Sequence, residues 1–322
     1  MEGVIDATTR RLLTAKGGFD WAVTEFVRVI DARLPAKVFL RICPELSQGV
    51  STPSGVPVHL QLLGSVPAVL GENARQAVAC GATCIDMNFG CPAKLVNRHD
   101  GGASLLRDPR RVFAAVQGVN RALEGSGVPV TAKVRLGFDD KRLALECARA
   151  AEDGGAAQLV VHARTRREGY RPPAHWEWIA RIRERLTIPV VANGDIWTLE
   201  DYWKARTLSG CQDVMLGRGA LADPWLAARI RHWQRSGERL AATSWSGRAQ
   251  VLREYALLIG EALPDKVVLS LLKQWLNIMR QHDGEAAQHF IALRRIKDLA
   301  EFLHALKASQ DQEADSPVAL PA

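Results

Sequence analysis

Short runs of β-branched and apolar residues alternate with amphipathic stretches along most of this chain. The seven runs lie at residues 21–26, 56–63, 84–89, 131–136, 159–163, 189–193 and 213–216. Between most of them lie amphipathic stretches at residues 72–79, 110–123, 141–152, 176–186 and 199–207. Strands that alternate with helices predict βα crossovers, and therefore an α/β fold with a parallel sheet covered by helices.

The length of 322 residues fits one parallel (β/α)8 barrel, or TIM barrel, of roughly 250 residues with a small appendage. A barrel needs eight strands, whereas this sequence opens with MEGVIDATTRRLLTAK, a loop that leads directly into a helix. We expect the first strand to be absent because the true start lies upstream of Met1, since a barrel without it leaves two strand edges unpaired. The alternative is a chain that is truly short.

The strand and helix alternation stops after Trp233. Three helices are predicted beyond it, at residues 246–260, 268–281 and 285–306. The last residues, ASQDQEADSPVALPA, are polar and then broken by proline, which is typical of disorder. We therefore expect a barrel domain over residues 1–243, a helical bundle domain over 244–307 and a disordered tail over 308–322.

Composition limits the class of protein. The net charge is +7 and the isoelectric point is near 9.3, which favours a polyanionic partner, although many enzymes are mildly basic. The six cysteines form no CxxC pair and no secretory segment opens the chain, so we expect reduced thiols, a cytoplasmic location and no metal site. No apolar run reaches the roughly 20 residues of a membrane span, so we expect a soluble protein.

Polar residues end every predicted strand, where the chemistry of a barrel collects. Each one alone could simply satisfy backbone groups, but together they predict a site. They include Glu25, Gln61, Asn88, Lys133, Arg135, His162, Arg164 and Asn193.

Two late strands run into glycine-containing turns, VVANGDI and VMLGRGALADPW. Backbone N–H groups in such turns can hold a phosphate, which indicates a site for FMN or for a sugar phosphate. Lys133, near the middle of the barrel, could stabilise negative charge on a reduced flavin ring or could pair with a barrel carboxylate.

Cys91 lies between Gly90 and Pro92 on a restricted loop after a strand. A thiol with a pKa near 8.5 is mostly protonated at neutral pH, so it can give up a proton as well as attack. The other cysteines lie in or beside apolar segments and are expected to pack in the core: Cys43, Cys80, Cys84, Cys147 and Cys211.

The segments NFGCPAKLVNRHDGGASLL, TAKVRLGF, VVHARTR, VANGDI and LGRGALADPW closely resemble the tRNA-dihydrouridine synthases. VPVHLQLLG and LKQWLNIM look most like the C-type branch of the bacterial enzymes, and the resemblance extends over residues 1 to 307. It implies an FMN-binding TIM barrel followed by a helical tRNA-binding domain. The implied reaction is the NADPH-dependent reduction of a uridine in the tRNA D-loop, at position 16, by a monomer.

The resemblance also implies roles for individual residues. Cys91 would be the general acid, which delivers a proton to C5 of the uracil. Met1 stands where family members have the methionine of a strand ending LAPMEG, and the flavin-contacting positions would be Met1, Gln61, Lys133 and His162. The residues that bind the phosphate of FMN would be Asn193, Gly194, Asp195, Gly217 and Arg218. Contacts with uracil or tRNA would come from Asn88, Arg28, Lys94, Lys273 and Arg294.

Two other functions remain open from the residues alone. An FMN-dependent oxidoreductase of small molecules could use the same barrel and phosphate grip, but it has little need for a basic helical appendage. An RNA-binding protein without activity would fit the missing strand, but the presence of Cys91, Lys133 and His162 together argues against it. No GxGxxG follows a strand, which fits a nicotinamide donor that docks only transiently.

Overall fold

The computed structural model describes residues 3–314, and side chains up to residue 310, so Met1 lies outside the described residues. The chain forms two compact units. The first consists of Met1–Arg10, Phe19–Ile196 and Glu200–Gly217. The second consists of Arg11–Gly18, Trp197–Leu199 and Arg218–Ala322.

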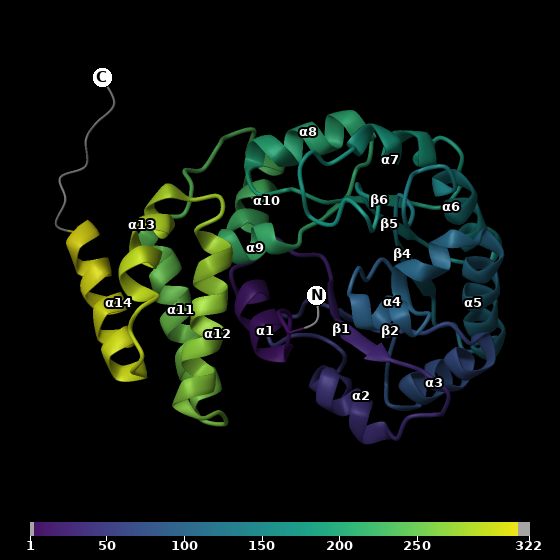
Figure 1. Cartoon of the computed structure of the whole chain (residues 1–322), viewed down its shortest axis with the longest axis horizontal. Coiled ribbons are helices and arrows are strands. Elements are labelled where there is room, and N and C mark those ends of the chain that lie inside the picture. Colours follow the sequence, from purple (N-terminus) through teal and green to yellow (C-terminus); the bar gives the residue numbers. More distant parts are fainter. Residues whose placement is uncertain (1–2, 315–322) are drawn as a thin grey trace. The chain divides into compact units, whose positions relative to one another are not determined.

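The first unit is built on one parallel sheet of seven strands in the order β1-β2-β3-β4-β5-β6-β7, and Figure 1 shows that this sheet is curved. Every pair of neighbours is parallel. The strands are β1 (Ala22–Arg28), β2 (Val58–Leu63), β3 (Ile85–Phe89), β4 (Val130–Arg135), β5 (Leu159–His162), β6 (Val190–Asn193) and β7 (Val214–Met215). The prediction of an α/β fold with a parallel sheet is confirmed, and each strand lies where the sequence predicts one.

Helices follow the strands and surround the outer face of the sheet (Figure 1). In β5 and β6 every residue is buried, as expected for parallel strands that are covered on both faces. The helical elements are α2 (Ala36–Ile42), η1 (Pro44–Ser47), α3 (Pro67–Ala79), α4 (Lys94–Arg98), η2 (Gly102–Arg107), α5 (Pro109–Ala122), α6 (Ala144–Asp153), α7 (Trp176–Arg183) and α8 (Leu199–Ser209).

Within residues 3–314 the first helix, α1 (Ala7–Ala15), precedes any strand. Among these residues β1 pairs only with β2 and β7 only with β6.

A buried ion pair fixes the beginning of α1 in the first unit. Arg10 donates to both carboxylate oxygens of Glu45, at 2.8 and 2.7 Å. Its guanidinium also donates to the carbonyls of Ile5 and Ile42. The Arg10 side chain is fully buried and that of Glu45 is 7% exposed, so both charges depend on each other for stabilisation.

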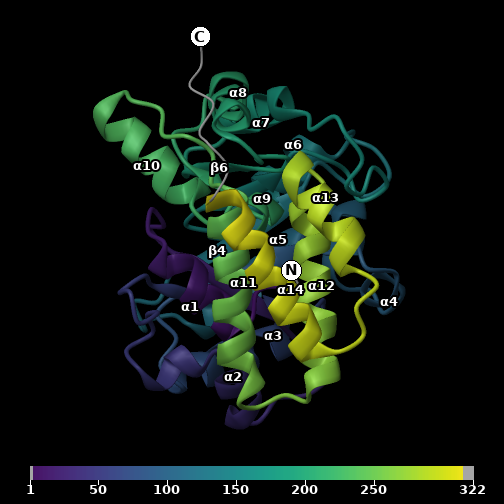
Figure 2. The same ribbon diagram turned by 90° about the vertical axis from the view of Figure 1, so that its left-hand side faces the viewer.

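The second unit is helical in the described residues after Arg218, with α9 (Arg218–Ala222), α10 (Leu226–Ser236), α11 (Trp245–Gly260), α12 (Asp265–Met279), α13 (Gly284–Leu293) and α14 (Leu299–Ala314). Figure 2 shows α11, α12 and α14 side by side, in agreement with their residue contacts. The indole Nε1 of buried Trp245, on α11, donates to Ser309 Oγ at 2.9 Å. Ser309 lies on α14 beyond Lys307, the residue at which the sequence predicts the helical domain to end.

The prediction of a single helix over residues 285–306 is wrong, because α13 and α14 are separate helices. Asp298 starts the second one, since its carboxylate accepts the N–H of Glu301 at 2.9 Å. The ammonium group of Lys273, on α12, donates to the carbonyl of Ile296 in the connection. A capping aspartate favours a helix start over a helix interior.

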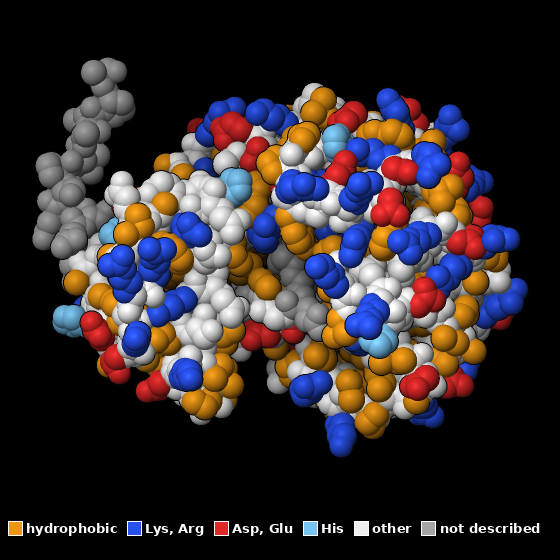
Figure 3. Space-filling view, in the orientation of Figure 1, with side chains coloured by type: hydrophobic (Ala, Val, Ile, Leu, Met, Phe, Trp, Pro, Cys, Tyr) orange, Lys and Arg blue, Asp and Glu red, His pale blue; other side chains and the backbone are white. Residues whose placement is uncertain are grey.

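None of the described helices combines the length and the apolar character that crossing a membrane requires. Lys and Arg side chains are scattered among acidic and apolar ones on the visible face of the first unit (Figure 3). The positive charge of this unit is therefore distributed over that face.

The Arg10 and Glu45 pair yields a stability prediction. Glu45→Gln removes one of two mutually dependent buried charges, so the free energy of unfolding should fall by about 2 to 4 kcal/mol. Urea unfolding followed by circular dichroism measures this difference. An unchanged unfolding midpoint would show that the pair is not needed for stability.

Candidate active site

The polar side chains of the strands are aligned across the sheet by its register. Asn88 on β3 pairs with Lys133 on β4. Arg135 on β4 pairs with His162 on β5, which pairs in turn with Asn193 on β6. Because alternate residues of a strand share a face, the parallel register brings these predicted site residues to one end of one face.

A chain of side-chain hydrogen bonds connects β2 and β3. The amide of Gln61 donates from Nε2 to Asp86 Oδ2 at 2.7 Å. The amide of Asn88 donates from Nδ2 to Gln61 Oε1, also at 2.7 Å. Asp86 also accepts the hydroxyl of Thr131 at 2.6 Å. The two predicted ligand-binding amides, Gln61 and Asn88, therefore lie in contact.

The loop after β3 holds Cys91 through its backbone. Asn88 Oδ1 accepts the N–H groups of Gly90 and Cys91, at 2.9 and 3.0 Å. On the other side, the carbonyl of Cys91 accepts Asn97 Nδ2 at 2.9 Å and the N–H of Ala103 at 3.2 Å. Cys91 is partly exposed, and these hydrogen bonds fix its backbone.

Glycine is required beside this loop. Gly102 has a φ of +59°, and a Cβ there would lie 3.0 Å from the Cβ of Cys91. Both the backbone conformation and the space exclude larger residues at this position. This explains the second glycine of the pair that follows the cysteine in the sequence.

Lys133 lies opposite the amide of Asn193. Its ammonium group donates to Asn193 Oδ1 at 2.9 Å, and Asn193 Nδ2 donates to the carbonyl of Met215 on β7 at 2.8 Å. Burial, with a smaller effect of the Arg135 charge, lowers the pKa of Lys133 to about 7, although the Asp86 charge acts against this. Lys133 is therefore only partly protonated at neutral pH.

The other group near Cys91 is the guanidinium of Arg135. It donates from Nε to the carbonyl of Gly90 at 2.7 Å, and it lies 5.3 Å from the ring centre of Tyr170. Burial lowers the pKa of Arg135, whereas the charges of Tyr170 and Cys91 raise it. The ring of His162 meets that of Tyr170 edge-on, with centroids 6.2 Å apart.

The turn after β6 is held by groups from the β5 side. Gly194 has a φ of +113° and Asp195 a φ of +50°. The carboxylate of Asp195 forms a two-point ion pair with Arg164, whose side chain is fully buried. Trp176 Nε1 donates to the carbonyl of Gly194 at 2.9 Å. The Asp195 side chain therefore positions the turn from inside the protein.

The remaining predicted residues lie farther along the chain or on the surface. Arg28 ends β1, and Lys94 begins α4 with an exposed side chain. Gly217 lies between β7 and α9. In the second unit, the Arg218 guanidinium lies 4.9 Å from the Trp197 ring centre. Lys273 and the exposed Arg294 belong to that unit as well.

Sequence reasoning missed two contributors to the Cys91 loop. Asp86 is 2% exposed and reads in the sequence as one polar residue within a strand. Asn97 follows the loop on α4 and holds the Cys91 carbonyl. The two-residue spacing of Asp86 and Asn88 is the signal that could have placed the acid on the same strand face.

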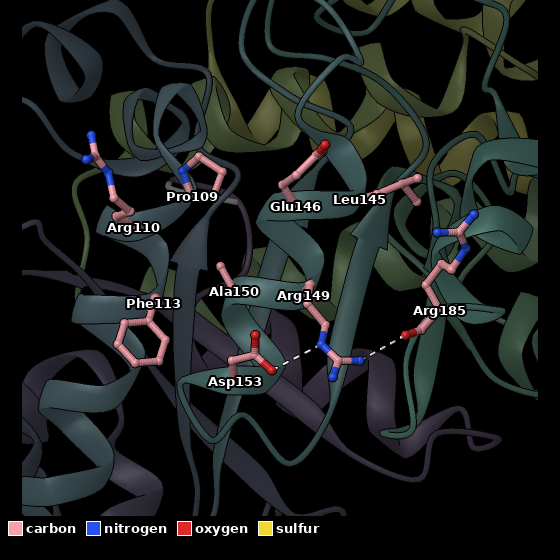
Figure 4. A pocket seen from close by; sticks show the side chains of 9 residues that line it. All are labelled: Pro109, Arg110, Phe113, Leu145, Glu146, Arg149, Ala150, Asp153 and Arg185. Atoms are coloured by element: carbon pink, nitrogen blue, oxygen red, sulfur yellow. Dashed lines mark hydrogen bonds and ion pairs between the residues drawn. The ribbon is translucent and has the colours of Figure 1, made fainter.

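A surface groove of about 570 Å³ lies elsewhere, against α5 and α6 (Figure 4). It contains none of the predicted site residues. One of its charged residues, Arg149, is engaged by Asp153 and by the carbonyl of Arg185. Its lining has no arrangement of groups like that around Cys91.

Comparison with known proteins shows which family the chain belongs to. The family model described as "Dihydrouridine synthase (Dus)" matches residues 1–314. The chain belongs to the dihydrouridine synthase family. Members of this FMN-dependent family reduce uridine in tRNA to dihydrouridine with NADPH, so the cofactor, the electron donor and the reaction class expected from the sequence are confirmed.

Two curated relatives are both named tRNA-dihydrouridine(16) synthase. The protein from Pseudomonas putida is 48% identical over 300 residues, which is 93% of this chain and 92% of the relative. The protein from Ralstonia nicotianae is 46% identical over 318 residues, 98% of this chain and 97% of the relative.

A solved structure adds a likeness of fold alone. It is a 2-naphthoyl-CoA reductase complex, at 11% identity and a TM-score of 0.53, which matches 71% of this chain and 47% of that one.

The low pKa of Lys133 yields a prediction about pH. Between pH 7 and 10 the unfolded chain carries a proton on this lysine that the folded protein lacks, so Lys133 makes stability rise with pH. Lys133→Met should remove this contribution, and the stability of wild type relative to the variant should increase from pH 7 to pH 9. Urea unfolding at both pH values tests this. A constant difference between the two proteins would mean that Lys133 stays charged in the folded state.

Proposed function

We propose that this chain reduces the uridine at position 16 of the tRNA D-loop to 5,6-dihydrouridine. The names of its relatives support the position. The observation that carries the proposal is the Cys91 loop, because a partly exposed thiol is fixed by backbone hydrogen bonds beside two amides. Because the substrate is tRNA, we expect the protein to act in the cytoplasm.

The residues at the strand ends fit FMN. A lysine ammonium, the amides of Gln61 and Asn193, and the His162 ring offer donors and acceptors of the kind that a flavin ring needs. Gly194, in a backbone conformation that favours glycine, leaves space beside the His162 ring, where a Cβ would be 3.5 Å away. We assign the ring to Gln61, Lys133 and His162, and the phosphate to the turns at Asn193, Gly194, Gly217 and Arg218.

In the proposed reaction two hydrogens add across the C5=C6 bond of the uracil. FMN, when bound, supplies the hydride that C6 accepts, with NADPH as its source. Cys91 gives its thiol proton to C5 and is left as a thiolate, so charge and atoms balance. Asn88, whose Oδ1 is occupied by the loop, can donate the remaining hydrogen of Nδ2 to a uracil carbonyl.

Arg135 is placed to assist Cys91. Its guanidinium is bonded to the carbonyl of Gly90, the residue before the cysteine. A positive charge near the thiol stabilises the thiolate that remains after proton delivery. The electrostatic attraction between the two groups also favours the charged form of Arg135.

We assign the tRNA-binding role to the helical region after residue 243, with residues 1–243 as the catalytic domain. Basic side chains are exposed directly after the ends of α12 and α13: the guanidinium groups of Arg280 and Arg294 lie 4.3 and 6.0 Å from the ring centre of Phe290. Guanidinium groups beside an aromatic ring suit both phosphates and bases. Lys273 contributes charge and also fixes the connection between α13 and α14.

The function is tested by incubating the purified protein with FMN, NADPH and an unmodified tRNA transcript. Mass spectrometry of ribonuclease fragments should find a gain of two hydrogens at U16. A transcript with cytidine at position 16 is the matched control and should remain unmodified. Reduction at another uridine, or none at all with a flavin-loaded protein, would contradict the proposal.

Cys91→Ala tests the proton donor. The variant should bind FMN and tRNA normally, because only the thiol is removed, but dihydrouridine formation should fall by on the order of 10²-fold or more. Absorbance of the bound flavin and a filter-binding assay with tRNA provide the controls. Turnover at the wild-type rate would remove Cys91 from the mechanism.

Binding of tRNA should weaken steeply as salt rises, because phosphate contacts release counterions. Arg294→Ala should reduce the slope of log affinity against log salt by about one unit. Arg121→Ala, on the exposed face of α5, is the matched control and should leave the slope unchanged. If both substitutions changed the salt slope equally, tRNA binding would depend on the net charge of the protein and not on a contact made by Arg294.

A further inference from the structure

A buried carboxylate lies beneath the candidate site without being one of its expected ligands. Asp86 is the second residue of β3 and is 2% exposed. It receives two hydrogen bonds, from Thr131 Oγ1 on β4 at 2.6 Å and from Gln61 Nε2 on β2 at 2.7 Å. A carboxylate with both oxygens satisfied by neighbouring strands is a fixed acceptor.

The direction of the hydrogen bonds above Asp86 is determined from both ends. At the upper end, the backbone N–H groups of Gly90 and Cys91 can only donate, so Asn88 must present Oδ1 to them. At the lower end, burial raises the pKa of Asp86, whereas the hydrogen bonds from Thr131 and Gln61 and the Lys133 charge lower it. In its ionised form Asp86 can only accept, so Gln61 presents Nε2 to it. Asn88 Nδ2 and Gln61 Oε1 then face each other as donor and acceptor.

Side-chain amides are symmetric in shape and can turn by half a rotation. If Gln61 turned, its NH₂ group would face the NH₂ group of Asn88, and one of the two would lose its partner. Chains of hydrogen bonds of this kind strengthen one another when every member is satisfied. Asp86 therefore fixes the orientation of Gln61, the loop N–H groups fix that of Asn88, and the two amides meet as donor and acceptor while both ends are in place.

We propose that Asp86 is a positioning residue for Cys91, which acts through Gln61 and Asn88 to hold the Gly90–Cys91 backbone in place for proton delivery. The proposal rests on the proposed function and extends it by one residue that touches neither uracil nor flavin. It requires Asp86 to act by accepting a hydrogen bond. If Asp86 had a purely structural role, the loss of kcat in its variants would be proportional to their loss of stability.

Two substitutions at one position separate these roles. Asp86→Leu has a similar size but no acceptor, so Gln61 loses its anchor. Asp86→Asn keeps an oxygen for Gln61, while the Thr131 hydroxyl can turn to accept from the new NH₂ group. The kcat for dihydrouridine formation should fall on the order of tenfold to a hundredfold in Asp86→Leu, with KM for tRNA little changed, and should stay within about threefold in Asp86→Asn.

Glu45→Gln is the matched control. Glu45 is also a buried carboxylate of the first unit, but it accepts its two hydrogen bonds from Arg10 on α1 and not from the residues that hold the Cys91 loop. It should lose stability and keep kcat. A comparable loss of kcat in Glu45→Gln would overturn the proposal, because general destabilisation would then explain the effect.

A second measurement follows the loop without turnover. Alkylation of Cys91 by iodoacetamide, quantified by mass spectrometry, should be about threefold faster or more in Asp86→Leu, because the backbone around the thiol is released. Asp86→Asn and Glu45→Gln should match wild type. Because this assay needs neither tRNA nor NADPH, it remains decisive even if wild type forms no dihydrouridine, a result that would overturn only the proposed function.

The amount of bound FMN shows whether Asp86→Leu lowers kcat by weakening the binding of the cofactor. Because Gln61 is also assigned to the flavin ring, kcat is expressed per bound FMN, and the fall in Asp86→Leu should persist after this normalisation. Loss of FMN in parallel with activity would overturn the proposal, as would wild-type kcat and alkylation in Asp86→Leu. If Asp86→Leu does not fold, Asp86→Val, which also lacks an acceptor and suits a buried strand, replaces it with the same outcomes.

Discussion

The parallel hydrogen bonding between β2, β3, β4, β5 and β6 is the constraint on which the candidate site depends. Its register sets Asn88 against Lys133 and His162 against Asn193, so residues separated by up to sixty positions in sequence become neighbours. A shift of one residue in any pair would turn these side chains to the other face. The buried apolar residues on both faces oppose such a shift, because it would move polar groups among the outer helices.

Buried polar groups beneath the candidate site orient the side chains and turns that form it. Asp86 and Thr131 lie under the amides, and Arg164 lies under the turn at Asp195. Each is deeply buried. Asp86 and Arg164 bond to Gln61 and Asp195, which the sequence marks as functional, and Thr131 bonds to Asp86. Burying such groups costs free energy unless they are hydrogen-bonded or paired. We therefore expect loss of one partner to destabilise the group that it leaves unpaired.

Much of this organisation could be predicted from the sequence, and the failures have physical reasons. Strand positions and the polar residues at their ends follow from period and from the rule that parallel strands collect their ends together. The break between α13 and α14 could not be predicted from the sequence. Asp298 begins a helix because its carboxylate accepts the N–H of Glu301, and this hydrogen bond is visible only in the structure. The partner of Asp195 was equally hidden, since an ion pair between β5 and β6 depends on register. The roles carried over from the family remain proposals.

The low pKa of Lys133 has a consequence for any anion that binds beside it. A lysine with a pKa of about 7 is only partly protonated at neutral pH. A negative group nearby favours the charged form, so binding must draw a fraction of a proton from the solvent. The measured enthalpy of binding would then depend on the ionisation enthalpy of the buffer, and the site would bind anions more tightly as the medium becomes more acidic.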